Sequence, residues 1–198
     1  IDIDYFYQKK SLKILNSTSN ILCVGRVCEG KGQADVIKAL AILKEKYNLT
    51  PQLYIAGIYT DEYKDSILIP ANKRNIGCNI HFMGQVNDIK NLYKKMGILC
   101  MSSHKEAFGR ATIEAMLSGL LVVGANSGGT AEIIKSKKTG YLYEAGNAEE
   151  LANRLAYIFQ NLDEAFDIAL NGQKYAKEHY DAERNAREIY ELYKSLFG

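Results

Sequence analysis

A glycine-rich turn with two cations follows the first apolar run of the chain. The stretch Gly25-x-x-x-x-Gly30-Lys31 matches a nucleotide-hydrolysing phosphate loop except at the last position, where Gly32 replaces Ser or Thr. Gly32 has no hydroxyl for Mg²⁺, and no Asp ends a second apolar run. A glycine turn between a strand and a helix still offers backbone N–H groups to a phosphate. Arg26 and Lys31 therefore suit a diphosphate, unless both are merely solvated loop cations.

Two glutamates in a second stretch could bind hydroxyl groups. Glu106 and Glu114 are separated by seven residues, so they would not stack on one continuous helix. We predict Glu106 in a loop and Glu114 inside the following helix, whose first turn holds Phe108, Gly109 and Arg110. Carboxylates beside free N–H groups form a sugar-phosphate site, and Gly109 lets a ligand approach the backbone. Taken alone, two such glutamates are more often surface groups of an amphipathic helix.

Short apolar runs alternate with amphipathic segments, which predicts a parallel sheet with helices on both faces. The apolar runs are residues 21–25, 52–57, 80–84, 98–103 and 120–125. The helical segments between them include residues 35–47, 88–96 and 110–119. From Ala148 onward the pattern is helical, with a break at Gly172 or before Asp181. The sequence therefore predicts one Rossmann-like α/β domain with a helical C-terminal tail.

Composition excludes several other classes. The 198 residues carry a net charge of +2, which is too small to indicate a nucleic-acid partner. No apolar run approaches the roughly 20 residues of a membrane span, and no signal peptide opens the chain. The four cysteines form no C-x-x-C motif and have no histidine at zinc-ligand spacing, so we expect reduced structural cysteines.

Together the two stretches resemble the C-terminal, donor-binding domain of a retaining glycosyltransferase of family 4. Such enzymes have the two-domain GT-B architecture. The resemblance covers roughly residues 20–158, and its most specific part is the E-x₇-E block that contains both glutamates. The matching positions are Gly25-Arg26, Lys31-Gly32, Phe82-Met83-Gly84-Gln85-Val86, Ser102-Ser103, Glu106-Ala107-Phe108-Gly109, Glu114-Ala115-Met116, Gly119, Val122-Val123, Gly128-Gly129, Glu132 and Gly140-Tyr141-Leu142.

The resemblance implies three catalytic residues. Arg26 and Lys31 would bind the diphosphate of a nucleotide-sugar and stabilise the leaving group as charge develops. Glu106 would accept hydrogen bonds from hydroxyls of the donor sugar. Family members work without a bound metal, so we expect neither a metal nor another cofactor. The donor would lie outside the carboxyl ends of the strands.

The resemblance also implies a set of donor-binding residues. Glu114 would hold the ribose, and the backbone near Val86 would touch the base. The N–H groups at the start of the second helix would cradle the sugar and the distal phosphate. Arg110 departs from the family, which commonly has an aliphatic residue there, and adds a cation. The expected donor-binding positions are Gly25, Val86, Phe108, Gly109, Arg110 and Glu114.

The resemblance divides the chain into three parts. We expect an inter-domain segment at residues 1–19 and a nucleotide-sugar-binding domain at residues 20–170. Residues 171–198 would form C-terminal helices that pack on this domain or toward an N-terminal acceptor domain. That acceptor domain is the expected partner and is missing from this chain. We therefore expect the chain to bind donor but to transfer little or no sugar.

The predicted activity is transfer of a hexosyl unit, with retention, from a UDP- or GDP-sugar to a glycan or lipid-linked acceptor. This would take place in the cytoplasm, either free or peripherally at the inner membrane surface. The alternatives are a nucleotide-sugar epimerase of the same fold and a non-catalytic nucleotide-binding module. A phosphorylase would need a pyridoxal-phosphate lysine, and no lysine here has a recognisable context. A phosphate-loop hydrolase would bind ATP with Mg²⁺.

Overall fold

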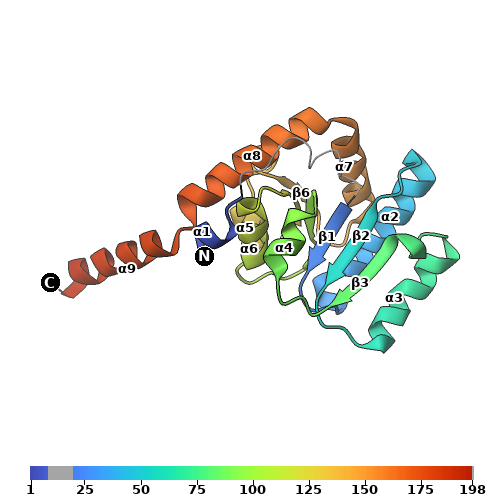
Figure 1. Cartoon of the computed structure of the whole chain (residues 1–198), viewed down its shortest axis with the longest axis horizontal. Coiled ribbons are helices and arrows are strands. Elements are labelled where there is room, and N and C mark those ends of the chain that lie inside the picture. Colours follow the sequence, from blue (N-terminus) through green and yellow to red (C-terminus); the bar gives the residue numbers. More distant parts are fainter. Residues whose placement is uncertain (9–19, 198) are drawn as a thin grey trace.

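A six-stranded parallel sheet forms the centre of the molecule (Figure 1). The computed structural model describes residues 1–8 and 20–197 of the chain. The strand order is β3-β2-β1-β4-β5-β6, and every pairing is parallel. The strands are β1 (Asn20–Val24), β2 (Gln52–Ala56), β3 (Ile80–Gly84), β4 (Ile98–Met101), β5 (Leu121–Ala125) and β6 (Tyr141–Tyr143). The predicted Rossmann-like α/β fold is confirmed, whereas the short strand β6 was not predicted.

Helices cover both faces of the sheet. One core cluster joins the sheet to α2, α3 and α7, and the other joins it to α1, α4, α5 and α6. Helix α8 contributes residues to both clusters, so it links the two layers. The helices are α1 (Ile3–Phe6), α2 (Gln33–Tyr47), α3 (Asp61–Lys73), α4 (Ile89–Lys94), α5 (Arg110–Leu117), α6 (Gly128–Ile133), α7 (Ala148–Gln160), α8 (Leu162–His179) and α9 (Ala182–Phe197).

Continuous apolar runs become central strands because both of their faces are buried. In β1, Ile21 and Cys23 point into the cluster under α2, while Leu22 points into the opposite cluster. Burial of the Cys23 thiol raises its pKa to about 12, which fits a structural cysteine. Strand β4 pairs with β1 in the register Ile21↔Ile98 and Leu22↔Leu99. This pairing places the carboxyl ends of β1 and β4 side by side.

One predicted boundary is corrected by the structure, and one that the sequence left open is decided. Helix α5 begins at Arg110, and Gly109 precedes it as a cap with φ +78°, so Phe108 and Gly109 lie outside the first turn. Helix α8 continues through Gly172, which packs so closely on Thr139 that an added Cβ would lie 2.5 Å from its carbonyl oxygen. This close packing leaves no room for a side chain at Gly172. The break between the C-terminal helices falls at the second predicted place, before Asp181.

The two ends of the described chain differ in how they pack. Helix α1 lies against α5, where Ser118 Oγ donates to Phe6 O at 3.2 Å. Residues 9–19 of the expected inter-domain segment lie outside the described residues. Helix α9 projects away from the body of the domain (Figure 1). Its apolar side chains are largely exposed, including Tyr193 at 64 % and Phe197 at 81 %.

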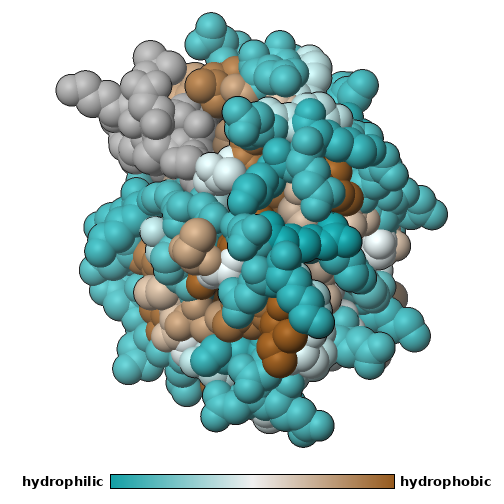
Figure 2. All heavy atoms as spheres, turned by 90° about the vertical axis from the view of Figure 1, so that its right-hand side faces the viewer, coloured by the Kyte–Doolittle hydropathy of each residue, from teal (hydrophilic) through white to brown (hydrophobic). Residues whose placement is uncertain are grey.

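The surface on the α3 side is mostly hydrophilic with an apolar area among the polar side chains (Figure 2). The elements on that side contribute exposed apolar residues, including Ile69 of α3 and Met83 of β3. Within the described residues, no helix combines the length and apolarity needed to cross a membrane.

Candidate functional site

The predicted site residues gather at the carboxyl ends of β1 and β4. These strands are neighbours although β2 and β3 lie between them in sequence. The chain order of the strands reverses between β1 and β4, and open α/β sheets bind ligands in the crevice at such a switch point. The loop after β1 supplies Arg26 and Lys31, and the loop after β4 supplies Glu106. The fold therefore brings both sequence stretches to one place.

The loop after β1 is tied to the neighbouring strand and to its own helix. Gly25 N–H donates to Ala56 O at 2.9 Å, and Val27 N–H donates to Ile58 O at 2.9 Å. Gln33 Nε2 donates to Arg26 O at 3.0 Å from the first turn of α2. These bonds fix the backbone on both sides of Arg26, while its side chain is exposed. A fixed loop with a free guanidinium suits binding of an anionic ligand.

Gly32 is the closest point of contact between the two loops. It caps the start of α2 with φ +68°, in the left-handed region that favours glycine. A Cβ at this position would lie 2.0 Å from Ser102 O, which is too close for any side chain. Ser102 Oγ also donates to Lys31 O at 2.8 Å. Contact between the two loops therefore requires glycine at position 32, where a phosphate loop would have Ser or Thr.

Lys31 and Glu106 form an ion pair between the loops. Lys31 Nζ donates to Glu106 Oε2 at 2.9 Å, and their side chains are 35 % and 15 % exposed. The start of α6 supports the backbone of Glu106, because Gly129 N–H donates to Glu106 O at 2.9 Å. Gly128 lies close behind, where a Cβ would be 2.0 Å from Glu106 O. The two glycines that begin α6 thus let this helix pack closely against the Glu106 loop.

Glu114 lies one turn inside α5, as predicted, and is largely buried. Tyr93 Oη donates to Glu114 Oε2 at 3.2 Å, and Arg110 lies 3.6 Å from Oε1. Burial raises the pKa of Glu114, against the smaller opposing effects of the Tyr93 hydrogen bond and the Arg110 charge. Burial next to Glu114 also raises the pKa of Tyr93, so the phenol stays protonated and donates. The carboxylate is therefore held in one orientation by two neighbours.

The remaining predicted residues lie at the same edge but are less closely connected. Val86 follows β3, which is separated from β4 by β2 and β1, and packs on the cluster that contains Tyr93. Phe108 is 60 % exposed in the loop before α5. The N–H groups of Phe108, Gly109 and Arg110 donate to no other described residue. Phe108 and Arg110 are exposed, whereas Gly109 is buried.

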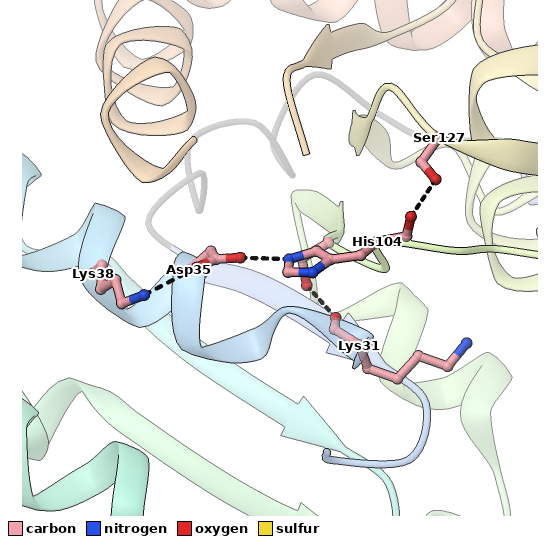
Figure 3. Close-up of polar contacts among 6 residues, drawn as sticks. Lys31, Asp35, Lys38, His104 and Ser127 are labelled. Carbon is pink, nitrogen blue, oxygen red and sulfur yellow. Dashed lines mark hydrogen bonds and ion pairs between the residues drawn. The ribbon is translucent and has the colours of Figure 1, made fainter. Parts of the chain in front are cut away.

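A polar network around the two loops was not predicted from the sequence. His104 Nε2 lies 2.7 Å from Asp35 Oδ2, and Figure 3 shows this contact. Asp35 comes four residues after Lys31, at a buried position of the amphipathic stretch. A charged residue on a buried stripe was the available signal. Tyr93 lies in the predicted helical segment at residues 88–96, and no sequence pattern indicates the contact that its hydroxyl makes.

Metal-ligand geometry is not found in the described part of the chain. No group of three or more His, Cys, Asp or Glu side chains there could hold a metal ion. Positive charge at the switch point comes instead from Arg26, Lys31 and Arg110. The arrangement can bind an anion at the loop after β1 and hydroxyl groups at Glu106 and Glu114.

The arrangement defines a Rossmann-like domain with a ligand site at its switch point. Residues 4–175 match the family described as glycosyl transferases group 1, which spans most of the chain. The chain belongs to this family. The predicted identity as a C-terminal domain of GT-B architecture is confirmed, whereas assignment to family 4 stays a prediction.

Curated relatives and solved structures agree with this assignment. The lipopolysaccharide core biosynthesis mannosyltransferase LpcC of Rhizobium leguminosarum is 28 % identical over 179 residues, covering 89 % of this chain and 51 % of the relative. The C-terminal domain of a group 1 glycosyltransferase (LpcC) from Francisella tularensis aligns with a TM-score of 0.81 and 25 % identity, covering 92 % of this chain and 99 % of that one.

Another similar structure contains a nucleotide-sugar. Anabaena HepE in complex with UDP-glucose aligns with a TM-score of 0.83 and 25 % identity, covering 98 % of this chain and 56 % of HepE. The chain spans about half the length of the curated relatives it matches, 51 % of LpcC and 49 % of the Staphylococcus aureus capsular polysaccharide glycosyltransferase CapM.

Proposed function

We propose that this chain is the donor-binding domain of a retaining glycosyltransferase of family 4. The enzyme would transfer a hexosyl unit from a UDP- or GDP-sugar to a glycan or lipid-linked acceptor. The observation that carries the proposal is the Lys31–Glu106 contact of 2.9 Å at the switch point. An ammonium that would bind phosphate then lies beside a carboxylate that would bind hydroxyls, which is the order of groups in a nucleotide-sugar.

Catalytic roles follow from the charges around this contact. Arg26 and Lys31 would bind the diphosphate and stabilise the negative charge of the leaving group without a metal. Glu106 would accept from hydroxyls of the sugar. In the ligand-free chain its charge is balanced by Lys31, and the donor would insert its own anion and hydroxyls at the same two groups. Transfer therefore depends on binding both parts of the donor at once.

Donor-binding roles follow from the loops around the pair. Glu114 would accept from the ribose hydroxyls, oriented by Tyr93. The free N–H groups of Phe108, Gly109 and Arg110 would cradle the sugar and the distal phosphate, and the Arg110 side chain would add a cation. The backbone near Val86 would contact the base, and the Gly25 backbone would flank the diphosphate.

The relatives support both the donor and the pathway class. HepE holds UDP-glucose in its solved complex. LpcC is a mannosyltransferase of lipopolysaccharide core biosynthesis, and CapM acts in capsular polysaccharide biosynthesis. We propose a similar polysaccharide or glycolipid product, made in the cytoplasm or at the inner membrane surface. An N-terminal domain would supply the acceptor site, with residues 1–19 as the connection and residues 171–198 as helices that pack on either domain.

Thermal shift with a panel of nucleotides tests the proposal. The chain is melted with UDP, GDP, ADP, UDP-glucose, GDP-mannose and ATP, each in Mg²⁺ and in EDTA. A ligand at about 100 times its Kd stabilises the fold by roughly 2.7 kcal/mol, which raises Tm by about 5–11 °C for a domain of this size. A shift with a UDP or GDP ligand in EDTA supports the proposal. A shift only with ATP and Mg²⁺ contradicts it.

Product analysis separates the remaining alternatives. Conversion of the donor sugar to its epimer, in the absence of any acceptor, would indicate an epimerase. Equal shifts with UDP and UDP-glucose, with no effect of Glu106→Gln on either, would indicate a nucleotide-binding module without sugar preference. Appreciable transfer to an acceptor by this chain alone would contradict the expectation that a second domain is needed.

A further inference from the structure

His104 belongs to one of the two loops of the proposed donor site and contacts the other. It precedes Glu106 by two residues in the loop after β4. Its backbone N–H donates to Gly30 O at 3.1 Å, in the turn that carries Lys31. Its carbonyl oxygen accepts from Ser127 Oγ in the loop after β5 (Figure 3). His104 therefore connects the loops that follow β1, β4 and β5.

The imidazole is held by a buried carboxylate. His104 Nε2 lies 2.7 Å from Asp35 Oδ2, and the Asp35 side chain is only 8 % exposed. Lys38 Nζ donates to the other oxygen, Oδ1, at 3.2 Å. A carboxylate can only accept, so the bond requires a proton on Nε2 and thereby fixes the tautomer of a neutral imidazole. The contact is a charge-assisted hydrogen bond, which is shorter and stronger than a neutral one.

Asp35 and Lys31 belong to the same short segment. Lys31 ends the turn after β1, and Asp35 lies in the first turn of α2. The hydrogen bond between Asp35 and His104 therefore also fixes the position of the Lys31 backbone. On the other side, holding His104 sets the start of the segment that leads to Glu106. Neither His104 nor Asp35 touches the Lys31 ammonium or the Glu106 carboxylate in the described contacts.

We propose that His104 and Asp35 form a positioning pair that sets the distance between the phosphate-binding Lys31 and the sugar-binding Glu106. The inference rests on the proposed donor-binding function. It adds a residue pair whose effect on donor affinity is indirect. Loss of the pair would remove no group that contacts the donor, but the distances between these groups would no longer be fixed. Binding depends steeply on such distances.

Calorimetric titration of the chain with UDP-glucose tests the inference. We expect His104→Ala to raise Kd about tenfold, because a charge-assisted hydrogen bond that fixes the site is lost. His104→Gln keeps an N–H donor at a similar reach and should restore Kd to within about twofold of the parent. Asp35→Asn should weaken binding as His104→Ala does. The matched control is His179→Ala, since His179 is an exposed histidine on α8 whose Nδ1 lies 2.9 Å from Tyr175 O in its own helix.

Two readouts separate positioning from general stability. Melting of each variant without ligand measures the fold, and the ¹⁵N spectrum of the imidazoles shows whether the proton sits on Nε2 of His104. A lowered Tm with an unchanged Kd in His104→Ala would overturn the inference, as would His104→Gln behaving like His104→Ala. Failure of the parent chain to bind UDP-glucose or GDP-mannose would instead overturn the proposed function, and the inference with it.

Discussion

Lys31 and Glu106 are 75 residues apart in sequence, and their side chains meet at 2.9 Å. Each lies in a loop that follows a central strand, and the strands that carry them are adjacent although not consecutive. Both side chains are mostly shielded from solvent, so their charges act on each other and on a ligand more strongly than surface charges would. The pair is therefore the natural first target for mutation.

Replacing Lys31 should weaken donor binding far more than replacing another paired lysine. Lys31→Met removes the ammonium that we propose binds the diphosphate, and hydrogen bonds to charged groups contribute about 1.5–3 kcal/mol, or roughly 10–100-fold in Kd. Lys46→Met is the control, since Lys46 also pairs with a glutamate, Glu149, but at the exposed surface. Titration with UDP-glucose measures both. Equal losses in the two variants would show that Lys31 has no special role.

Removing the charge of Glu114 should stabilise the fold and weaken binding of the donor. Burial raises the pKa of Glu114 above the ordinary 4.5, so the folded protein binds this proton more tightly than the unfolded chain. The resulting stability is complete below the unfolded pKa and is lost as pH rises through the folded pKa. Glu114→Gln should therefore have the higher Tm at about pH 7.5, and the difference should shrink toward pH 4.5.

The same variant should lose ribose contacts. We expect a rise in Kd of about tenfold for UDP, because a neutral amide accepts more weakly than a carboxylate. The exposed Glu132→Gln serves as the control for loss of one charge. Melting curves across pH and titrations at neutral pH measure the two effects. A lower Tm at neutral pH in Glu114→Gln would mean that the Tyr93 and Arg110 contacts outweigh burial.

A side chain at Gly32 should damage the site, whereas one at Gly30 should not. In Gly32→Ala the new Cβ meets Ser102 O at 2.0 Å, and φ is +68°. Strain of this kind costs on the order of 1–3 kcal/mol, which lowers Tm by about 2–12 °C. Gly30→Ala places its Cβ in open space with nothing within 4 Å. Equal Tm and Kd in the two variants would contradict the proposed contact between the loops.

Removal of α9 should leave this domain intact. The apolar side chains of the helix are exposed, so they contribute little to the core described here. A chain ending at Asp181 should melt within about 2 °C of the parent and bind UDP-glucose equally well. Leu155→Ala, which empties a fully buried position of α7, should cost about 2–5 kcal/mol by comparison. A large loss of Tm on truncation would show that α9 supports the domain.

Strand and helix types were predictable because their apolar patterns are strong. The central strands were predicted to within two residues of their observed bounds, since burial on both faces demands an uninterrupted apolar run. The edge strand β3 was predicted at its observed bounds, residues 80–84, although it is only partly buried. Strand β6 was missed because its three residues are too short to show a pattern. The continuity of α8 through Gly172 was also hidden, because the reason is contact with Thr139, a distant residue.

The candidate site was predictable only in part. Lys31 and Glu106 could be singled out by residue type and by family resemblance, but no local pattern predicts that they touch. The partners that orient the site residues, Tyr93 and Asp35, lie at helical positions that look like core. Their polar atoms acquire a role only through neighbours brought in by the sheet, which sequence spacing does not reveal.

The adjacency of β1 and β4 also governs when the site can exist during folding. Strands β1, β2 and β3 pair with strands that are consecutive in sequence, but the other edge of β1 stays open until β4 joins the sheet across the intervening β2 and β3. Non-local parallel pairing of this kind is slow, because a long loop must close first. Affinity for the nucleotide-sugar should therefore appear late in refolding, which makes the ligand a kinetic probe of β4 insertion.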